Sequence, residues 1–175
     1  MLDLPAMKDD GSPLLLRPAR PADADRLAEI QAGAVRACGR GFYPDPVIEA
    51  WAWGPEKRDA CRSWIGEPGI EVRTCDERER PIAFAVFVAS SDAVYVHSLY
   101  CDCQRMRRGI GRMLMAEIRQ YAQARDKRRL TVQSSLNAVG FYGGLGFSRL
   151  GEGFQEIGPA KLRWTYIAMA KPLMA

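Results

Sequence analysis

The sequence feature that most constrains the fold lies in the middle of this chain. It is a predicted strand followed by a basic loop with two glycines and then by an amphipathic helix. Residues 93–101 are predicted to form the strand, and residues 109–125 repeat apolar side chains at helical spacing. The start of such a helix offers unbonded backbone N–H groups and a partial positive charge. Gly109 and Gly111 carry no Cβ, so a ligand can approach the backbone closely. The segment therefore predicts a mixed helix-and-strand fold with an anion site at the loop, of the kind that phosphates occupy.

Basic side chains sharpen this prediction, because four of them crowd the positive end of the helix dipole. They are Arg105, Arg107, Arg108 and Arg112. A cation at that place costs about 0.3–1 kcal/mol before screening, and a multiply charged anion in the loop would offset this cost. A solvated basic turn is the alternative interpretation. Two common phosphate motifs do not match, because Leu114 replaces the last glycine of a dinucleotide fingerprint and the loop lacks the Gly-Lys-Ser/Thr of a P-loop.

The remaining sequence alternates helical and strand patterns, which predicts an α/β (α+β) domain built on one mixed sheet. Further strands are predicted at residues 14–17, 69–75, 81–90, 129–134 and 163–171, and helices from residue 21, at 47–53, at 56–64 and at 137–145. The charged segment 76–80 is predicted to be the turn of a hairpin. Residues 151–161 fit no element and are expected to form a connection.

Length, charge and cysteine content narrow the class of protein. The 175 residues fit one domain, so we assign residues 1–13 to a flexible leader and residues 14–175 to the domain. No apolar run approaches the ~18 residues of a membrane span, and the acidic start is unlike a secretory signal, so we expect a cytoplasmic protein without membrane association. A net charge of +4 is too mild to indicate nucleic acid. Five irregularly spaced cysteines predict reduced thiols, and a single histidine with one C-x-C pair predicts no metal site.

A second motif lies one predicted strand after the loop, at residues 135–147. With the loop, it resembles the GNAT superfamily of acyl-CoA N-acyltransferases. In the second motif the residues that match the family pattern are Ser135, Ala138, Phe141, Tyr142, Gly146 and Phe147. In the first, the matches to Leu-x-Val-x-Pro and to the glycines of Gln/Arg-x-x-Gly-x-Gly/Ala are Leu99, Cys101, Cys103, Gly109 and Gly111. Met106 stands where Gln or Arg is usual, which puts one side-chain contact in question.

The resemblance implies a mostly antiparallel twisted sheet that splays after its fourth strand and carries helices on both faces. It also implies acetyl-CoA as the acyl donor, an amine as the acceptor, and a homodimer as a common assembly. The residues implied to bind the donor are Leu99, Tyr100, Cys101, Met106, Arg107, Arg108, Gly109, Ile110, Gly111, Arg112, Ser135, Asn137 and Tyr142.

Two residues are candidates for proton transfer in a reaction of this family. His97 is the only histidine, has an intrinsic pKa near 6.5, and resembles a strand histidine of arylalkylamine N-acetyltransferases. Strand alternation predicts that it shares a face with Leu99 and Cys101. Tyr142 is the candidate acid for the departing thiolate. A buried structural histidine and a core tyrosine are the alternatives, and we interpret Cys101 as a packing residue instead of a nucleophile.

The acceptor is not identified by the sequence. An aromatic group could hold an amine by cation–π contact, and it comprises Phe42, Tyr43, Trp51 and Trp53, with Tyr95 as a further contact. Alternatively, Arg36, Arg40 and Arg58 could favour an acidic acceptor. Other functions left open are a CoA-binding sensor without turnover, a transferase of longer acyl groups, and a nucleic-acid binder using Arg105–Arg112 and Arg125–Arg129.

Overall fold

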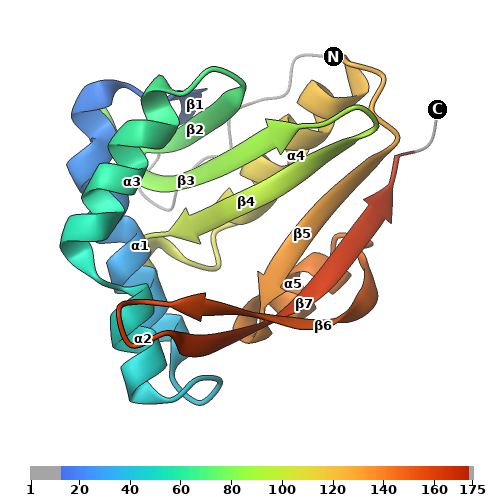
Figure 1. Ribbon diagram of the computed structural model, residues 1–175. Helices are drawn as coiled ribbons and strands as arrows, with labels where there is room; N and C mark the ends of the chain where they lie inside the picture. The colour runs from blue at the N-terminus through green and yellow to red at the C-terminus, as the bar shows by residue number, and fades with distance from the viewer. Residues whose placement is uncertain (1–12, 174–175) are drawn as a thin grey trace.

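Seven strands form one twisted sheet in the order β1-β2-β3-β4-β5-β7-β6 (Figure 1). The computed structural model describes residues 13–173, so the leader predicted for residues 1–13 lies outside the described residues except for Pro13. The strands are β1 (Leu14–Pro18), β2 (Ile70–Glu77), β3 (Arg80–Ala89), β4 (Ala93–Cys101), β5 (Arg129–Ser135), β6 (Ser148–Ile157) and β7 (Leu162–Pro172). All neighbouring pairs are antiparallel except β4 and β5, which are parallel.

Helices cover both faces of this sheet. The helices on one face are α1 (Ala24–Gly39), α2 (Asp45–Trp51) and α3 (Gly54–Gly66), and those on the other are α4 (Ile110–Gln123) and α5 (Val139–Gly143) (Figure 1). Short 3-10 turns are η1 (Pro21–Asp23), η2 (Cys103–Arg105) and η3 (Leu136–Ala138). Leu27 and Ile30 of α1 pack on Phe84, whereas Leu114 and Ile118 of α4 pack on Phe87 from the opposite side. None of the described helices is long and apolar enough to cross a bilayer.

The β2–β3 hairpin has a shorter turn than the charged segment 76–80 predicts. Glu77 and Arg80 are paired across the two strands, which leaves only Arg78 and Glu79 in the turn. Both have positive φ angles, 52° and 63°, as a two-residue turn with the twist of the flanking strands requires. The predicted five-residue turn is therefore wrong at its start and its end.

Buried ion pairs explain why acidic residues belong to that strand. Arg17 of β1 donates from Nε to Asp76 Oδ2 at 2.7 Å, and Arg105 donates from Nε to Glu77 Oε2 at 2.9 Å. Both carboxylates are buried, so they need such partners. The partners come from other parts of the chain, and hydrophobicity patterns along one segment do not show them.

Residues 151–161 are not a simple connection, because most of them belong to β6. This strand pairs only with β7 and forms the edge of the sheet. Its side chains are mainly exposed, and Phe154 and Leu150 are among them. An edge strand with little burial lacks the alternation that identifies half-buried strands, which is why the sequence pattern did not predict it.

Strands β4 and β5 part soon after they begin. Their parallel pairing covers only Ala93–Val96 against Arg129–Val132. Beyond these residues, β4 pairs with β3 and β5 pairs with β7, and the two strands diverge (Figure 1). The splayed sheet predicted from the family resemblance is thus confirmed.

A β-bulge in β4 changes which residues share a face. Val86 and Phe87 of β3 pair with Ser98 and Val96, so His97 is an extra residue without a partner on β3. The shift places Leu99 and Cys101 in the core under α4, while the ring of His97 meets Trp64 of α3 on the opposite face. The prediction that His97 is in phase with Leu99 and Cys101 is therefore wrong.

Candidate active site

Two cavities meet where β4 and β5 separate. The larger, of about 620 Å³, lies beside the start of α4, and the smaller, of about 330 Å³, lies between β4, β5 and α3. The residues that line both are Trp51, Leu99, Tyr100, Ser135 and Ala138. A ligand in the larger cavity can therefore reach a second ligand in the smaller one.

The larger cavity brings together most of the residues predicted to bind the donor. Those that line it are Leu99, Tyr100, Cys101, Met106, Arg107, Gly109, Ile110, Gly111, Arg112, Ser135 and Asn137. Arg108 lines neither cavity, and Tyr142 lines the smaller one. The side-chain oxygen of Asn137 is buried without a hydrogen-bond partner among the described residues.

The start of α4 has the geometry of an anion site. No side chain caps this helix, and its first turn contains no acid. The first intrahelical bond runs from Met113 N to Gly109 O, so the N–H groups of Ile110, Gly111 and Arg112 precede it. Gly109 is left-handed, with φ of 78° and ψ of −1°, and is followed by helical Ile110. Such a left-handed to right-handed step turns successive N–H groups to one side, where they bind anions.

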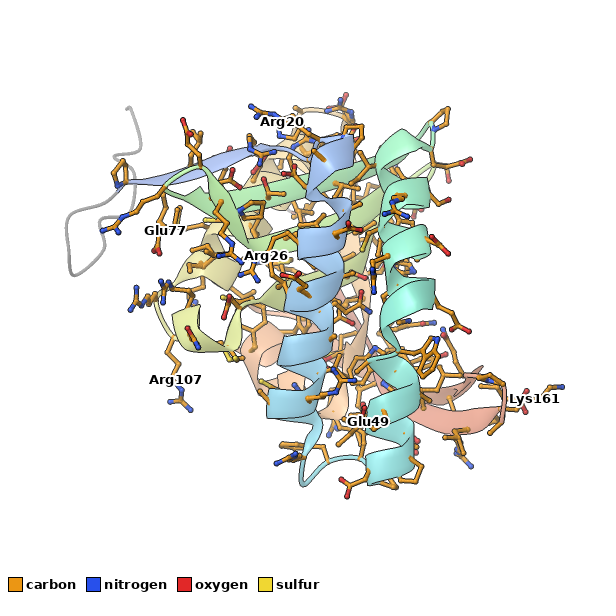
Figure 2. All side chains as sticks on the ribbon, turned by 90° about the vertical axis from the view of Figure 1, so that its left-hand side faces the viewer. Arg20, Arg26, Glu49, Glu77, Arg107 and Lys161 are labelled. Atoms are coloured by element: carbon orange, nitrogen blue, oxygen red, sulfur yellow. The ribbon has the colours of Figure 1, made fainter. Side chains whose placement is uncertain are left out.

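The four arginines of the loop do not act alike. Arg105 is held by Glu77, whose side chain is only 6% exposed, so this cation is already paired. Within residues 13–173, no ion pair engages Arg107, Arg108 or Arg112. Arg107 projects from the loop away from the body of the molecule (Figure 2). Of the four, Arg107 and Arg112 combine an unpaired charge with a place at the larger cavity.

Gly109→Ala is expected to lower the free energy of unfolding by about 1–2 kcal/mol, because a residue with a Cβ is strained in the left-handed region. Open space surrounds the position, so the cost comes from the backbone and not from a clash. Gly33→Ala is the matched control. It lies within α1, a Cβ there meets nothing within 4 Å, and it is expected to stabilise by about 0.5–1 kcal/mol. Urea unfolding of both variants checks the prediction, and shifts of the same sign would contradict it.

The smaller cavity is lined by aromatic and polar side chains. Its aromatic residues are Trp51, Trp64, Tyr95, Tyr100, Tyr142 and Trp164. Its other polar residues are Gln31, Lys57, His97, Ser98, Gln133, Ser134, Ser135 and Gln155. No aspartate or glutamate is among the described residues that line it. Lys57 is therefore the only formally charged side chain among the described residues of its lining.

His97 lies on the wall of the smaller cavity with part of its ring open to solvent. Its Nδ1 is 2.9 Å from Ser98 Oγ, and its ring centroid is 5.1 Å from that of Trp64. Partial burial, with the nearby charge of Lys57, lowers the pKa of His97 below the usual 6.5. The imidazole is thus neutral at pH 7 and able to accept a proton.

Tyr142 also faces the smaller cavity, from the segment that follows β5. Its side chain is buried, and this burial raises the pKa of its phenol above the usual 10. Its ring packs edge-on against Phe141 and Phe147, at 5.1 and 5.4 Å. Phe141 in turn lies under α4, since a Cβ on Gly111 would come within 3.1 Å of it. The two sequence motifs therefore touch in space, with a protonated phenol at their junction.

The aromatic group predicted for the acceptor is only partly assembled. Trp51 lines both cavities and Tyr95 lines the smaller one, whereas Phe42 lines the larger. Trp53 is exposed. Tyr43 lines neither cavity.

Tyr43 is held in the core instead. Its hydroxyl donates to the Thr165 carbonyl at 2.7 Å and accepts from the Leu136 N–H at 2.8 Å. We therefore assign it to positioning of η3 and β7. The arginines considered for an acidic acceptor also lie elsewhere, since neither cavity is lined by Arg36, Arg40 or Arg58. Arg36 forms an ion pair with Glu49 at 2.8 Å.

Sequence reasoning missed Lys57, Trp64 and Gln31, which line the smaller cavity. One signal could have pointed to Lys57. It falls on the same helical stripe as Cys61 and Trp64, where an apolar residue is expected.

Neither cysteine of the C-x-C pair has the properties of a nucleophile. Burial raises the pKa of the Cys101 thiol to about 12, so it stays protonated, and Cys103 is exposed and lines neither cavity. Within residues 13–173, no group of three or more His, Cys, Asp or Glu side chains could hold a metal ion.

Comparisons with known proteins agree with this geometry. Residues 56–165 match the acetyltransferase (GNAT) domain family. A GCN5-related N-acetyltransferase from Rhodopseudomonas palustris superimposes with a TM-score of 0.82 at 24% identity, covering 91% of this chain and 95% of that one. PaiA N-acetyltransferase from Thermoplasma acidophilum, solved with coenzyme A, gives 0.71 at 16% identity, over 91% and 99% of the chains. The ribosomal-protein-S18-alanine N-acetyltransferase from Escherichia coli gives 0.68 at 19% identity, over 93% and 96%. Among curated proteins, none matches this sequence.

Proposed function

Because the chain belongs to the GNAT acetyltransferase family, we propose that it transfers an acetyl group from acetyl-CoA to the primary amine of a small molecule or peptide by direct attack. The observation that carries this proposal is the meeting of two cavities at the β4–β5 opening. One ends on an uncapped helix start suited to a diphosphate, and the other holds a neutral imidazole and a protonated phenol. Binding of coenzyme A by the Thermoplasma PaiA supports the donor assignment.

The donor is proposed to lie in the larger cavity. Its pyrophosphate would accept from the N–H groups at the start of α4, with Arg107 and Arg112 supplying charge. Its pantetheine arm would lie along β4 at Leu99 and Cys101, where β4 has no strand beside it on the β5 side in the described part of the chain. Met106 also lines this cavity, and its thioether offers apolar contact where the family has a polar side chain.

The acceptor is proposed to lie in the smaller cavity, where proton transfer can occur at both ends of the reaction. His97 takes the proton of the attacking amine, and a backbone N–H of β4 near Leu99 stabilises the oxyanion that forms. Tyr142 protonates the sulfur as the C–S bond breaks. The high pKa of this buried phenol keeps its proton available at neutral pH.

A panel of amines, amino acids, peptides and aminoglycosides, each tested for release of CoA thiol from acetyl-CoA, tests the proposal. We expect release that depends on the acceptor and a mass increase of the acceptor by one acetyl group. Competition by longer acyl-CoAs identifies the preferred acyl length. Binding of acetyl-CoA without release for any acceptor class would contradict transfer and leave a CoA-binding sensor.

A further inference from the structure

We propose that the smaller cavity takes an acceptor with a carboxylate beside its amine, such as a free amino acid, and that Lys57 binds this carboxylate. The inference rests on the proposed function, since it names the substrate class of the same site. Lys57 is the only lysine or arginine among the described residues that line this cavity.

The place of Lys57 on its helix is unusual. Lys57, Cys61 and Trp64 follow one another at spacings of four and three residues, so they lie on one face of α3. Cys61 is fully buried on that face, and Trp64 packs against the His97 ring. The other basic residues of α3, Arg58 and Arg62, are exposed. Lys57 alone thus turns its charge toward the sheet.

The protein compensates the partly buried charge of Lys57 only in part. Burial lowers the pKa of Lys57, which shows that its surroundings disfavour the ammonium form. The carboxylate of Glu56, next to it in sequence, offsets this effect only in part. Within residues 13–173, no carboxylate forms an ion pair with Lys57. An anionic group of a ligand would supply the missing partner.

The charge balance of the cavity favours the same class of acceptor. The described residues that line it include no aspartate or glutamate, so they offer a second ammonium group no counter-ion. A polyamine would place like charge beside Lys57, whereas an amino acid brings one anion and one amine. The positive charge also disfavours protonation of the amine, which must be neutral to attack the thioester.

Two residues that line the cavity each carry a buried polar atom without a hydrogen-bond partner among the described residues. The Trp164 Nε1–H is buried and unbonded, and it can donate to a carboxylate oxygen. Gln31 is 3% exposed, and its Oε1 lacks a donor, which an amine can supply. Unbonded buried polar groups are costly, so a ligand that satisfies them binds more tightly.

The size and walls of the cavity limit the acceptor further. About 330 Å³ is near the small end of ligand pockets. Trp51, Trp64 and Trp164 form apolar walls, so a single amino acid with an apolar side chain fits this site better than a polar oligomer.

The test compares the twenty proteinogenic amino acids with their amides and with the corresponding decarboxylated amines. We expect the wild-type protein to use the best amino acid with a kcat/KM about 10- to 100-fold above that of its amide, the size expected for one charged hydrogen-bonded contact. In Lys57→Gln this ratio falls to near one, and Lys57→Arg restores part of it. Because the lysine charge lowers the pKa of His97, Lys57→Gln also moves the acidic limb of the pH profile to higher pH.

Arg58→Gln is the matched control, because it removes a charge from the outer face of the same helix. It should leave both the ratio and the pH limb unchanged. Acetyl-CoA binding, measured for every variant, reports whether the fold is retained, since Lys57 does not line the larger cavity. If amides or decarboxylated amines were turned over as fast as amino acids, the proposal that Lys57 binds a carboxylate would be wrong, whereas the proposed acetyl transfer would still hold. Absence of turnover with every amine would overturn the proposed function itself.

Discussion

Tyr142→Phe is expected to lower kcat by about 10²–10⁴-fold, the usual contribution of a positioned proton donor. The change removes only the hydroxyl that faces the smaller cavity, so the departing thiolate would have no acid. The ring contacts with Phe141 and Phe147 remain, and the melting temperature should change little. Because Tyr142 does not line the larger cavity, the Kd for CoA should stay near the wild-type value.

Steady-state turnover with the most active amine, together with CoA binding by calorimetry, checks this result. Tyr121→Phe is the control, since that tyrosine packs on Phe87 and Arg125 and lines neither cavity. Full turnover by the Tyr142 variant would assign the residue to the core alone. A loss that appeared equally in both variants would indicate a general effect of removing a hydroxyl.

His97→Gln is expected to lower kcat/KM by about 10²–10⁴-fold near neutral pH, because the amine loses its proton acceptor. In the wild type, activity should rise with pH through a limb below 6.5, as the imidazole loses its proton. This limb lies at a lower pH than for an ordinary histidine, because burial and the charge of Lys57 both lower the pKa of His97. The variant should lack this limb altogether.

The pH dependence of kcat/KM for wild type and variant checks this prediction. Tyr95 of β4 and Tyr142 face the same cavity, but burial raises the pKa of each phenol above 10, so their titration lies on the alkaline side. Ser98→Ala removes the contact at Nδ1 but keeps the ring, so its acidic limb should persist. An acidic limb that survives in His97→Gln would exclude His97 as the base.

The sequence predicted the residues that line the larger cavity better than those that line the smaller one, for a physical reason. The loop at Gly109 and the helix after it are local, so spacing and charge along one segment identify them. The smaller cavity draws Gln31 from α1, Lys57 from α3 and Trp164 from β7. These residues meet only through the packing of the sheet, which no single segment encodes.

The error at His97 has a different origin. Alternation along a strand holds only while each residue has one partner, and the extra residue in β4 breaks this rule. Nothing in the residues around it signals a bulge. The hairpin of β2 and β3 was predicted correctly, but the bounds of its turn were wrong, and β6 was taken for a connection, since buried ion pairs and an exposed sheet edge both hide the apolar pattern.

The short parallel pairing of β4 with β5 implies an order in which the two substrates bind. His97 belongs to the half of the sheet made by β1 to β4, whereas Tyr142 follows β5 in the other half. Within residues 13–173, the halves are joined through backbone hydrogen bonds where Ala93–Val96 pairs with Arg129–Val132, and by the bond from the Arg128 N–H to the Asp92 carbonyl just before this pairing. A donor lying across the opening would act as an eighth strand, and its binding would fix the separation between base and acid. We therefore expect donor binding to complete the acceptor cavity, so that the donor enters first and the amine second.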